Sequence, residues 1–316
     1  MRFTPPLFLR VSLLMLATHS FAAAQSDKME RIPDIPYADT DNPRQMLDVF
    51  LPTNRTSELL PVVVYIHGGG WRNGSKDRGN RSLAPLVSTG NYIGISVGYR
   101  LTNEAQWPSQ IHDCKAAIRW IRAHAKTYGM DPDRIGIFGT SAGGHLVSML
   151  GTSGDVPAME GDLGPHTGES SRVTCVADLF GPTNFLLMNS TAAPGAKLDH
   201  DAAKSPESLL IGGAIQEHPQ KVATANPITY VTPDDPPFLI IHGTLDPLVS
   251  YNQSEIFQTA LNDAKVDNTL ITVTDGGHGK GFPPATAEAM ARFFDHHLRN
   301  IPSKWSDHAV AATPWR

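Results

Sequence analysis

The stretch RIGIFGTSAGGHLVSML, residues 134–150, decides the fold of this 316-residue chain. A short apolar run ends in Gly139-Thr-Ser-Ala-Gly143, and an apolar segment with helical spacing follows it. This order predicts a strand, a very tight turn and a helix, with Ser141 at the apex. Glycines at both ends of the turn remove side chains that would clash, and the helix N-terminus favours negative charge near the hydroxyl. A Gly-x-Ser-x-Gly sequence also occurs in turns without a catalytic role, so the flanking strand and helix carry the argument.

Apolar runs with strand spacing alternate with amphipathic helical segments along most of the chain. Strands are expected at 31–37, 45–51, 61–67, 92–97, 135–138, 173–180, 237–242 and 269–274, and helices at 78–89, 110–128, 145–150, 251–264 and 286–298. The alternation predicts an α/β fold, in which a mostly parallel sheet is covered by helices on both faces. Residues 183–233 contain many helix and strand breakers, and we expect them to form a small insertion over the active edge of the sheet.

The first 24 residues have the pattern of a signal peptide. Arg2 and Arg10 supply positive charge, residues 11–17 form a short apolar run, and Ala22-Ala-Ala24 offers a cleavage site. The run is too short to span a bilayer, so the sequence predicts a secreted or periplasmic protein without a stable membrane anchor. One α/β domain is expected over residues 25–300, followed by a loose C-terminal tail over 301–316.

Charge and cysteine content narrow the possible partners and cofactors. The formal net charge is −5 and no cluster of lysine or arginine stands out, so we expect no nucleic-acid partner. In an oxidising compartment, Cys114 and Cys175 would either form one disulfide or remain two separate buried thiols, and the sequence leaves both open. Two cysteines make no metal framework, and we expect neither a metal nor a cofactor. The sequence gives no indication of oligomeric state.

A serine nucleophile requires a base and an orienting acid, and two loops offer them. Asp246 lies just past the strand at 237–242, and His278 lies on a glycine-flanked loop after the strand at 269–274. The order Ser141, Asp246, His278 is typical of nucleophile, acid and base placed after successive strands. Taken singly, the aspartate fits a turn or helix cap, and a loop histidine is often merely solvated. Other candidates fit less well, namely Asp267 and Asp275 for the acid and His145, His242, His296 and His297 for the base.

The sequence His67-Gly-Gly-Gly-Trp71 follows a buried strand and offers unobstructed backbone N–H groups. We expect Gly69 and Gly70, together with Ala142, to form an oxyanion hole, the set of donors that stabilises charge on the substrate oxygen. A phosphate-binding glycine loop is the alternative, but no lysine and Ser/Thr pair follows at the spacing of a nucleotide site. Trp71 fits either the core or the wall of a substrate-binding acyl pocket, and we favour the wall.

These motifs together resemble the α/β-hydrolase fold, and within it the secreted carboxylesterases related to hormone-sensitive lipase. The greatest similarity is to the bifunctional feruloyl and acetyl xylan esterase group, and it covers about residues 30–300. The stretches that carry it are His67-Gly-Gly-Gly-Trp71, Gly139-Thr-Ser-Ala-Gly-Gly144, His242-Gly-x-x-Asp246, Gly277-His-Gly279, Leu47-Asp-Val-Phe-Leu-Pro52, residues 113–120 and Phe180-Gly-Pro-Thr183.

The resemblance implies a serine carboxylesterase without metal or cofactor. Ser141 would be the nucleophile, Asp246 the acid and His278 the base. The substrate would be a small-molecule or polysaccharide-linked ester with a short acyl or hydroxycinnamoyl group. Two other functions are weighed: a serine peptidase of the same fold, and a non-catalytic binding protein built on it.

Overall fold

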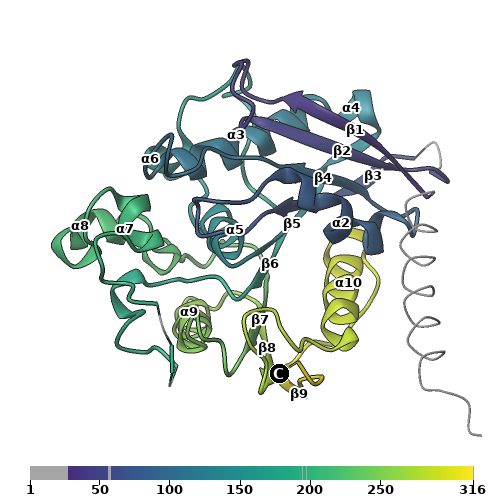
Figure 1. Cartoon of the computed structure of the whole chain (residues 1–316). Coiled ribbons are helices and arrows are strands. Elements are labelled where there is room, and N and C mark those ends of the chain that lie inside the picture. The colour runs from purple at the N-terminus through teal and green to yellow at the C-terminus, as the bar shows by residue number, and fades with distance from the viewer. Residues whose placement is uncertain (1–27, 56–57, 194, 197, 316) are drawn as a thin grey trace, which may run out of the picture.

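A nine-stranded sheet forms the centre of the molecule (Figure 1). The computed structural model describes residues 28–55, 58–193, 195–196 and 198–315, so the expected signal peptide at 1–24 lies outside the described residues. The spatial order of the strands is β1-β2-β4-β3-β5-β6-β7-β8-β9. The strands are β1 (Met29–Pro36), β2 (Met46–Pro52), β3 (Leu60–Ile66), β4 (Ile93–Val97), β5 (Met130–Thr140), β6 (Cys175–Leu179), β7 (Phe238–Gly243), β8 (Asn268–Thr274) and β9 (His308–Ala311).

Only β2, the second strand from one edge, runs against the others. β1 pairs antiparallel with β2, β2 pairs antiparallel with β4, and every later pairing is parallel. Parallel strands need crossover connections, and helices supply most of them. The α-helices are α2 (Gly79–Val87), α3 (Ser109–Ala123), α4 (Ala125–Tyr128), α5 (Ala142–Thr152), α6 (Pro157–Glu160), α7 (Pro206–Ile211), α8 (Pro219–Thr224), α9 (Asn252–Asp263) and α10 (Pro284–Arg299). Short 3-10 turns are η1 (Lys76–Arg78), η2 (Phe185–Leu187), η3 (Ile215–Glu217) and η4 (Pro227–Thr229).

Helices cover both faces of the sheet, as the alternating pattern predicts. Figure 1 shows α2 and α10 on one face and α3, α5 and α9 on the other. Each face has its own apolar cluster, one packed under α3 and α5 and one under α2 and α10. Strand β3 is buried along nearly its whole length, which its β-branched sequence allows because both of its faces meet apolar helices. The fold is that of the α/β hydrolases.

The register brings the functional loops to one edge. Ile66, at the end of β3, pairs with Gly139 of β5, and Thr140, at the end of β5, pairs with Leu179 of β6. β7 and β8 also run parallel, with Gly243 opposite Val273. The loops that follow β3, β5, β7 and β8 therefore leave the sheet at the same edge, where ligands bind in open α/β sheets.

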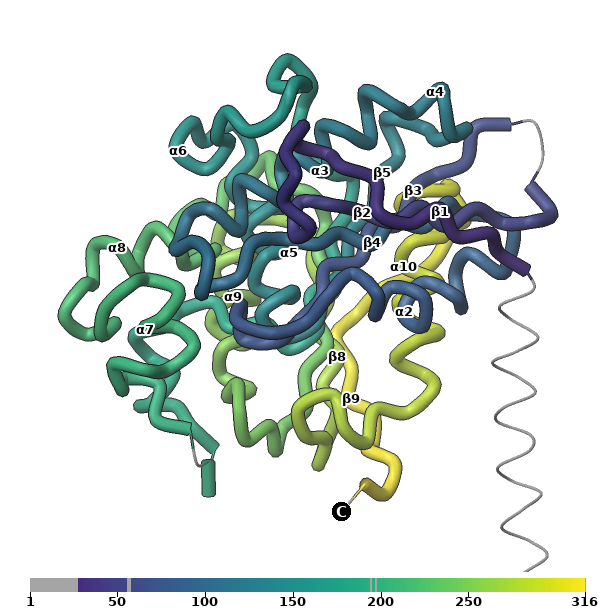
Figure 2. The backbone as a smooth tube through the Cα atoms, turned by 45° about the horizontal axis from the view of Figure 1, so that its top comes forward, coloured from purple at the N-terminus to yellow at the C-terminus, as the bar shows by residue number. Residues whose placement is uncertain are grey.

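The prediction of a loose tail over residues 301–316 is wrong for residues 308–311, which form a strand. Residues His308–Ala311 form β9, which pairs in parallel with Ile271–Thr274 of β8 and extends the sheet (Figure 2). The strand is short and mostly exposed, so its sequence lacks the apolar alternation that marks a half-buried strand. It is held by its pairing with β8 and by Val310, which packs against the apolar cluster under α2 and α10.

The two cysteines are separate buried thiols, the second of the two alternatives above. Cys114 and Cys175 are both free and fully buried. Cys114 belongs to the apolar cluster under α3 and α5, whereas Cys175 belongs to the cluster under α2 and α10, so the sheet lies between them. Burial raises the pKa of both thiols well above the usual value.

The insertion at 183–233 connects β6 to β7 and carries α7 and α8. In Figure 2 these two helices extend beyond the end of the sheet. Its described residues Leu198, His200, Pro206 and Glu207 line the pocket that contains Ser141, which places the insertion at the active edge. Among the helices of the described part of the chain, none is long and apolar enough to cross a membrane.

Candidate active site

Ser141 occupies a strained turn between β5 and α5. Its backbone angles are φ 56° and ψ −122°, which non-glycine residues rarely adopt, and its N–H donates to the carbonyl of Leu179 at 2.9 Å. A Cβ at Gly143 would collide with the carbonyl oxygen of Ile66, and one at Gly139 would collide with the backbone of Gly143. The two glycines therefore permit the close packing of strand, turn and helix that presents the serine at the apex.

Asp246 and His278 meet above the ends of β7 and β8. His278 Nδ1 lies 2.7 Å from Asp246 Oδ2. The other carboxylate oxygen accepts the backbone N–H groups of Leu248 at 2.8 Å and Val249 at 2.9 Å, which fixes its orientation. Burial alone would raise the pKa of Asp246, but the hydrogen bonds from His242 and His278 outweigh it and hold that pKa well below the usual range. The aspartate is therefore an ionised, immobilised partner for the imidazole.

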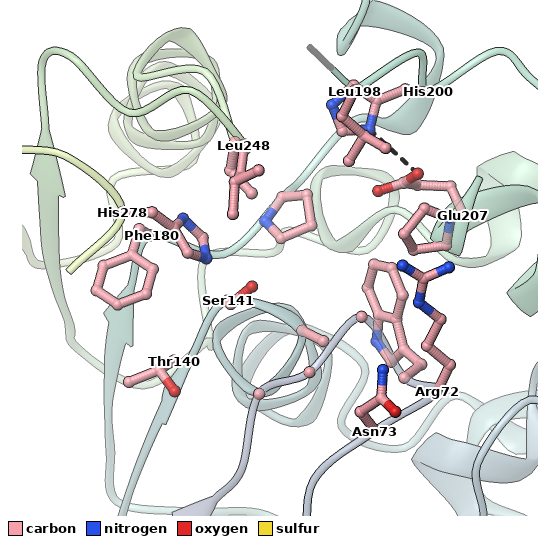
Figure 3. A pocket seen from close by; sticks show the side chains of 18 of the residues that line it. Arg72, Asn73, Thr140, Ser141, Phe180, Leu198, His200, Glu207, Leu248 and His278 are labelled. Carbon is pink, nitrogen blue, oxygen red and sulfur yellow. Dashed lines mark ion pairs between the residues drawn. The ribbon is translucent and has the colours of Figure 1, made fainter. Parts of the chain in front are cut away.

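The imidazole of His278 lies beside Ser141. Because Nδ1 is occupied by Asp246, the second ring nitrogen is the one available to the serine, and Figure 3 shows a ring nitrogen turned toward the hydroxyl. Phe180 packs against the imidazole with ring centroids 4.6 Å apart. Ser141 and His278 thus line the same pocket, and His278 is bonded to Asp246 behind it.

A second histidine, which the sequence analysis ranked low, contacts the same carboxylate. His242 Nε2 lies 3.3 Å from Asp246 Oδ2 and 3.0 Å from the carbonyl oxygen of Val249. Since that carbonyl only accepts, Nε2 carries the hydrogen, and Nδ1 accepts from the hydroxyl of Ser254 at 2.6 Å. His242 is fully buried beside the aspartate and has no contact with the pocket, so it is a partner of the acid and not an alternative base.

The loop after β3 turns two glycines toward Ser141. Gly69 and Gly70 have φ angles of 128° and 59°, and Gly68 approaches Thr140 and Ser141 so closely that a Cβ there would clash. Across the described residues, the N–H groups of Gly69 and Gly70 donate to no protein acceptor. The N–H of Ala142 is the first of α5 and has no acceptor within the helix. All three residues line the pocket around the serine.

Trp71 is both a core residue and a pocket residue, so the two interpretations of the sequence are compatible. It is 1% exposed, yet it lines the pocket. Its Nε1–H donates to Nδ1 of His145 at 3.2 Å, and Nε2 of that histidine donates to the carbonyl oxygen of Ala225 at 2.6 Å. Burial lowers the pKa of His145 to about 4, so the ring is neutral at pH 7. His145 thereby connects Trp71 to the insertion and is not positioned as a base.

The other candidates from the sequence are not brought to the serine. The carbonyl of Asp267 accepts the N–H of Phe238 at the start of β7. This aspartate therefore lies at the N-terminal end of β7, away from Ser141. Asp275 is exposed and lies outside the pocket of Ser141. His296 and His297 lie near the end of α10. No group of three or more potential metal ligands occurs among the residues that the structure describes.

The site opens into a pocket of about 760 Å³ with two different sides. Phe180, Pro182, Leu198, Leu248 and Val249 give it apolar walls. Polar groups come from two segments: Arg72 and Asn73 after the glycine loop, and His200 and Glu207 from the insertion. Figure 3 shows them across the pocket from Phe180 and Leu248, whereas Leu198 lies beside His200.

His200 and Glu207 form a buried ion pair in this wall. His200 Nδ1 lies 3.1 Å from Glu207 Oε2, although neither atom has a partner with hydrogen-bond geometry among the described residues. Burial lowers the pKa of His200. The adjacent carboxylate and the carbonyl of Leu248 raise this pKa by more than burial lowers it, so the net shift is upward. No motif in the sequence marks this pair, because its two members are brought together only by the folding of the insertion.

A family model named BD-FAE matches residues 47–261, which is more than half of the chain. The chain belongs to the BD-FAE family. Among curated proteins, Esterase LipC of Mycobacterium tuberculosis is 30% identical over 267 residues, which is 82% of this chain and 64% of LipC. Esterase LipQ of the same organism is 32% identical over 73% of this chain and 52% of its own length. The chain thus spans between half and two thirds of these two relatives.

Solved structures of carbohydrate esterases are similar over most of the chain. One, described as a truncated form of a carbohydrate esterase from gut microbiota, has a TM-score of 0.76 and 32% identity, covering 85% of this chain and 96% of that one. A bifunctional GH43-CE protein of Bacteroides eggerthii has a TM-score of 0.77 and 34% identity, covering 85% of this chain and 35% of its own. The α/β-hydrolase fold and the family are therefore shown by independent comparisons.

Proposed function

We propose that this protein is a serine carboxylesterase with Ser141 as nucleophile, His278 as base and Asp246 as acid. The observation that carries the proposal is the 2.7 Å contact between His278 Nδ1 and Asp246 Oδ2, with the other ring nitrogen turned toward Ser141 (Figure 3). The family and the esterase names of its relatives support the same activity.

The proposed mechanism follows from the geometry. His278 takes the proton of the Ser141 hydroxyl as its oxygen attacks the ester carbonyl, and Asp246 stabilises the imidazolium that forms. The carbonyl oxygen, now negative, accepts hydrogen bonds from the N–H groups of Gly69, Gly70 and Ala142. His278 then protonates the departing alcohol, which leaves an acyl group on the serine. Water activated by the same histidine hydrolyses the acyl-enzyme and restores the free serine.

We further propose that the substrate is an acetyl or feruloyl ester, on a small molecule or on a plant polysaccharide. The pocket supports this class because its volume of about 760 Å³ accepts more than an acetyl group, and because polar side chains face its apolar walls. The two carbohydrate esterases of similar structure support an ester on a sugar. Trp71 would form part of the wall beside the acyl group.

A panel of esters tests the activity and the substrate class together. We expect turnover of p-nitrophenyl acetate and methyl ferulate, and a higher kcat/KM for acetylated xylo-oligosaccharides than for octanoyl esters. Cleavage of a dipeptidyl anilide with no ester turnover would favour the peptidase instead. A protein that turns over none of these compounds would support a non-catalytic binding protein of this fold.

Secretion is proposed from the first 24 residues alone. Expression of the whole chain in a bacterial host, followed by N-terminal sequencing of the exported protein, is expected to give a mature chain that begins at Gln25. Retention of the unprocessed chain inside the cell would contradict the proposal.

A further inference from the structure

The segment that follows β9 lies against the loop that carries His278. The N–H of Ala312 donates to the carbonyl of Thr274 at 2.9 Å, and the N–H of Thr313 donates to the carbonyl of Gly281 at 2.8 Å. These two bonds reach the residues on either side of the loop at 275–280. In Figure 2 the C-terminal segment lies beside β8, at the end of the sheet opposite to β1.

Trp315 covers the outer side of this loop. Its Nε1–H donates to the carbonyl oxygen of Asp275 at 2.8 Å. The indole ring lies so close to two loop glycines that it leaves no room for a side chain: a Cβ at Gly277 would be 2.6 Å from Cη2 of the ring, and one at Gly281 would also clash. The ring therefore contacts the loop backbone on both sides of His278 and bonds to its first residue.

The inner side of the same loop is held by Phe180. A Cβ at Gly279 would be 2.9 Å from Cζ of Phe180, whose ring also packs on the imidazole of His278. The glycines that flank His278 thus touch Trp315 on one side and Phe180 on the other. Of the described residues that line the active pocket, none belongs to the segment after β9, so Trp315 has no contact with the proposed substrate site.

We propose that Trp315 is a positioning residue, which clamps the loop so that His278 keeps its place between Asp246 and Ser141. The inference rests on the proposed function, in which His278 is the base. Proton transfer depends on hydrogen-bond geometry, and a displacement of about 1 Å at a reacting group costs up to roughly 100-fold in rate. Loss of the clamp should therefore lower kcat without changing the affinity for the ester.

The first test compares kinetic constants of purified full-length variants. Trp315→Ala is expected to lower kcat for p-nitrophenyl acetate roughly tenfold or more, with KM within about twofold of the wild type. Trp315→Phe keeps a flat ring over Gly277 and is expected to recover most of the loss. If Trp315→Ala does not fold, Trp315→Leu takes its place with the same expectation. An unchanged kcat in the folded variant would overturn the inference.

A matched control separates positioning from loss of stability. Tyr128 is also a half-buried aromatic residue, but it is the last residue of α4, just before β5 begins. It therefore lies at the N-terminal end of β5, whereas Ser141 follows the C-terminal end. Tyr128→Ala should lower the midpoint of thermal unfolding by an amount comparable with Trp315→Ala while kcat stays at the wild-type value. An equal fall in kcat for both variants would mean that general stability, and not the clamp, controls the rate.

A double-mutant cycle identifies the residue through which Trp315 acts. In a His278→Ala background, Trp315→Ala is expected to leave the residual rate unchanged, because the group it positions is already gone. The same fold-loss in both backgrounds would overturn the inference. A wild-type protein without esterase activity would overturn the proposed function and this inference with it, whereas an active wild type with an unaffected Trp315→Ala would overturn the inference alone.

Discussion

His242 Nε2 lies 3.3 Å from the same Asp246 oxygen that His278 contacts at 2.7 Å. The carboxylate is therefore held between two imidazoles, one that faces the pocket and one that is buried behind it. His242 takes no part in proton transfer in the proposed mechanism, but it supplies one of the hydrogen bonds that keep the acid ionised and oriented.

Replacement of His242 should impair the enzyme through Asp246. We expect His242→Ala to lower kcat roughly tenfold, far less than His278→Ala, because the acid keeps its backbone donors but loses one side-chain partner. Steady-state kinetics on p-nitrophenyl acetate measure the difference. Equal losses in the two variants would contradict the assignment of His278 as the base.

Asp246→Asn should keep the fold and lose most of the activity. The amide cannot hold the His278 tautomer that accepts a proton from Ser141, so kcat should fall by roughly 10³- to 10⁴-fold.

Because the folded-state pKa of Asp246 is depressed, its ionised form stabilises the fold above about pH 4, and this contribution is lost as the pH falls further. The midpoint of thermal unfolding should therefore fall more between pH 6 and pH 3 in the wild type than in Asp246→Asn.

The pair of His200 and Glu207 should give the opposite pH dependence. The folded-state pKa of His200 is raised, so its contribution is fully present below about pH 6.5 and is lost as the pH rises through that pKa. Glu207→Gln removes the charge that raises it. The midpoint of thermal unfolding should fall more between pH 6 and pH 9 in the wild type than in this variant. Parallel pH profiles would show that the pair contributes no ionisation-linked stability.

Neither cysteine should react in the native protein. Both thiols are fully buried and their pKa values are raised, so little thiolate is available at pH 8. We expect no reaction with a disulfide reagent until the protein is unfolded, then two equivalents, and no effect of reductant on the unfolding midpoint. A midpoint lowered by reductant would indicate a disulfide.

The sequence predicts the parts of the site whose signals are local. The turn at Ser141 is marked by glycines within two residues of it, and the sheet is marked by β-branched runs such as Val62-Val-Val64. What it could not predict depends on contacts between distant segments. In the sequence, His242 has no feature that separates it from other residues at strand ends, and its contact with Asp246 forms only in the folded chain. Trp315 lies in a polar tail, and only the pairing of β9 with β8 brings its indole onto the loop of His278.

The central claim of the proposed mechanism is that Ser141 is the nucleophile, and covalent labelling tests this claim most directly. The folded protein is treated with a fluorophosphonate, digested and examined by mass spectrometry. We predict a single adduct on Ser141, absent in Ser141→Ala and formed much more slowly in His278→Ala. An unlabelled wild type, or a Ser141→Ala protein that is still labelled, would contradict it.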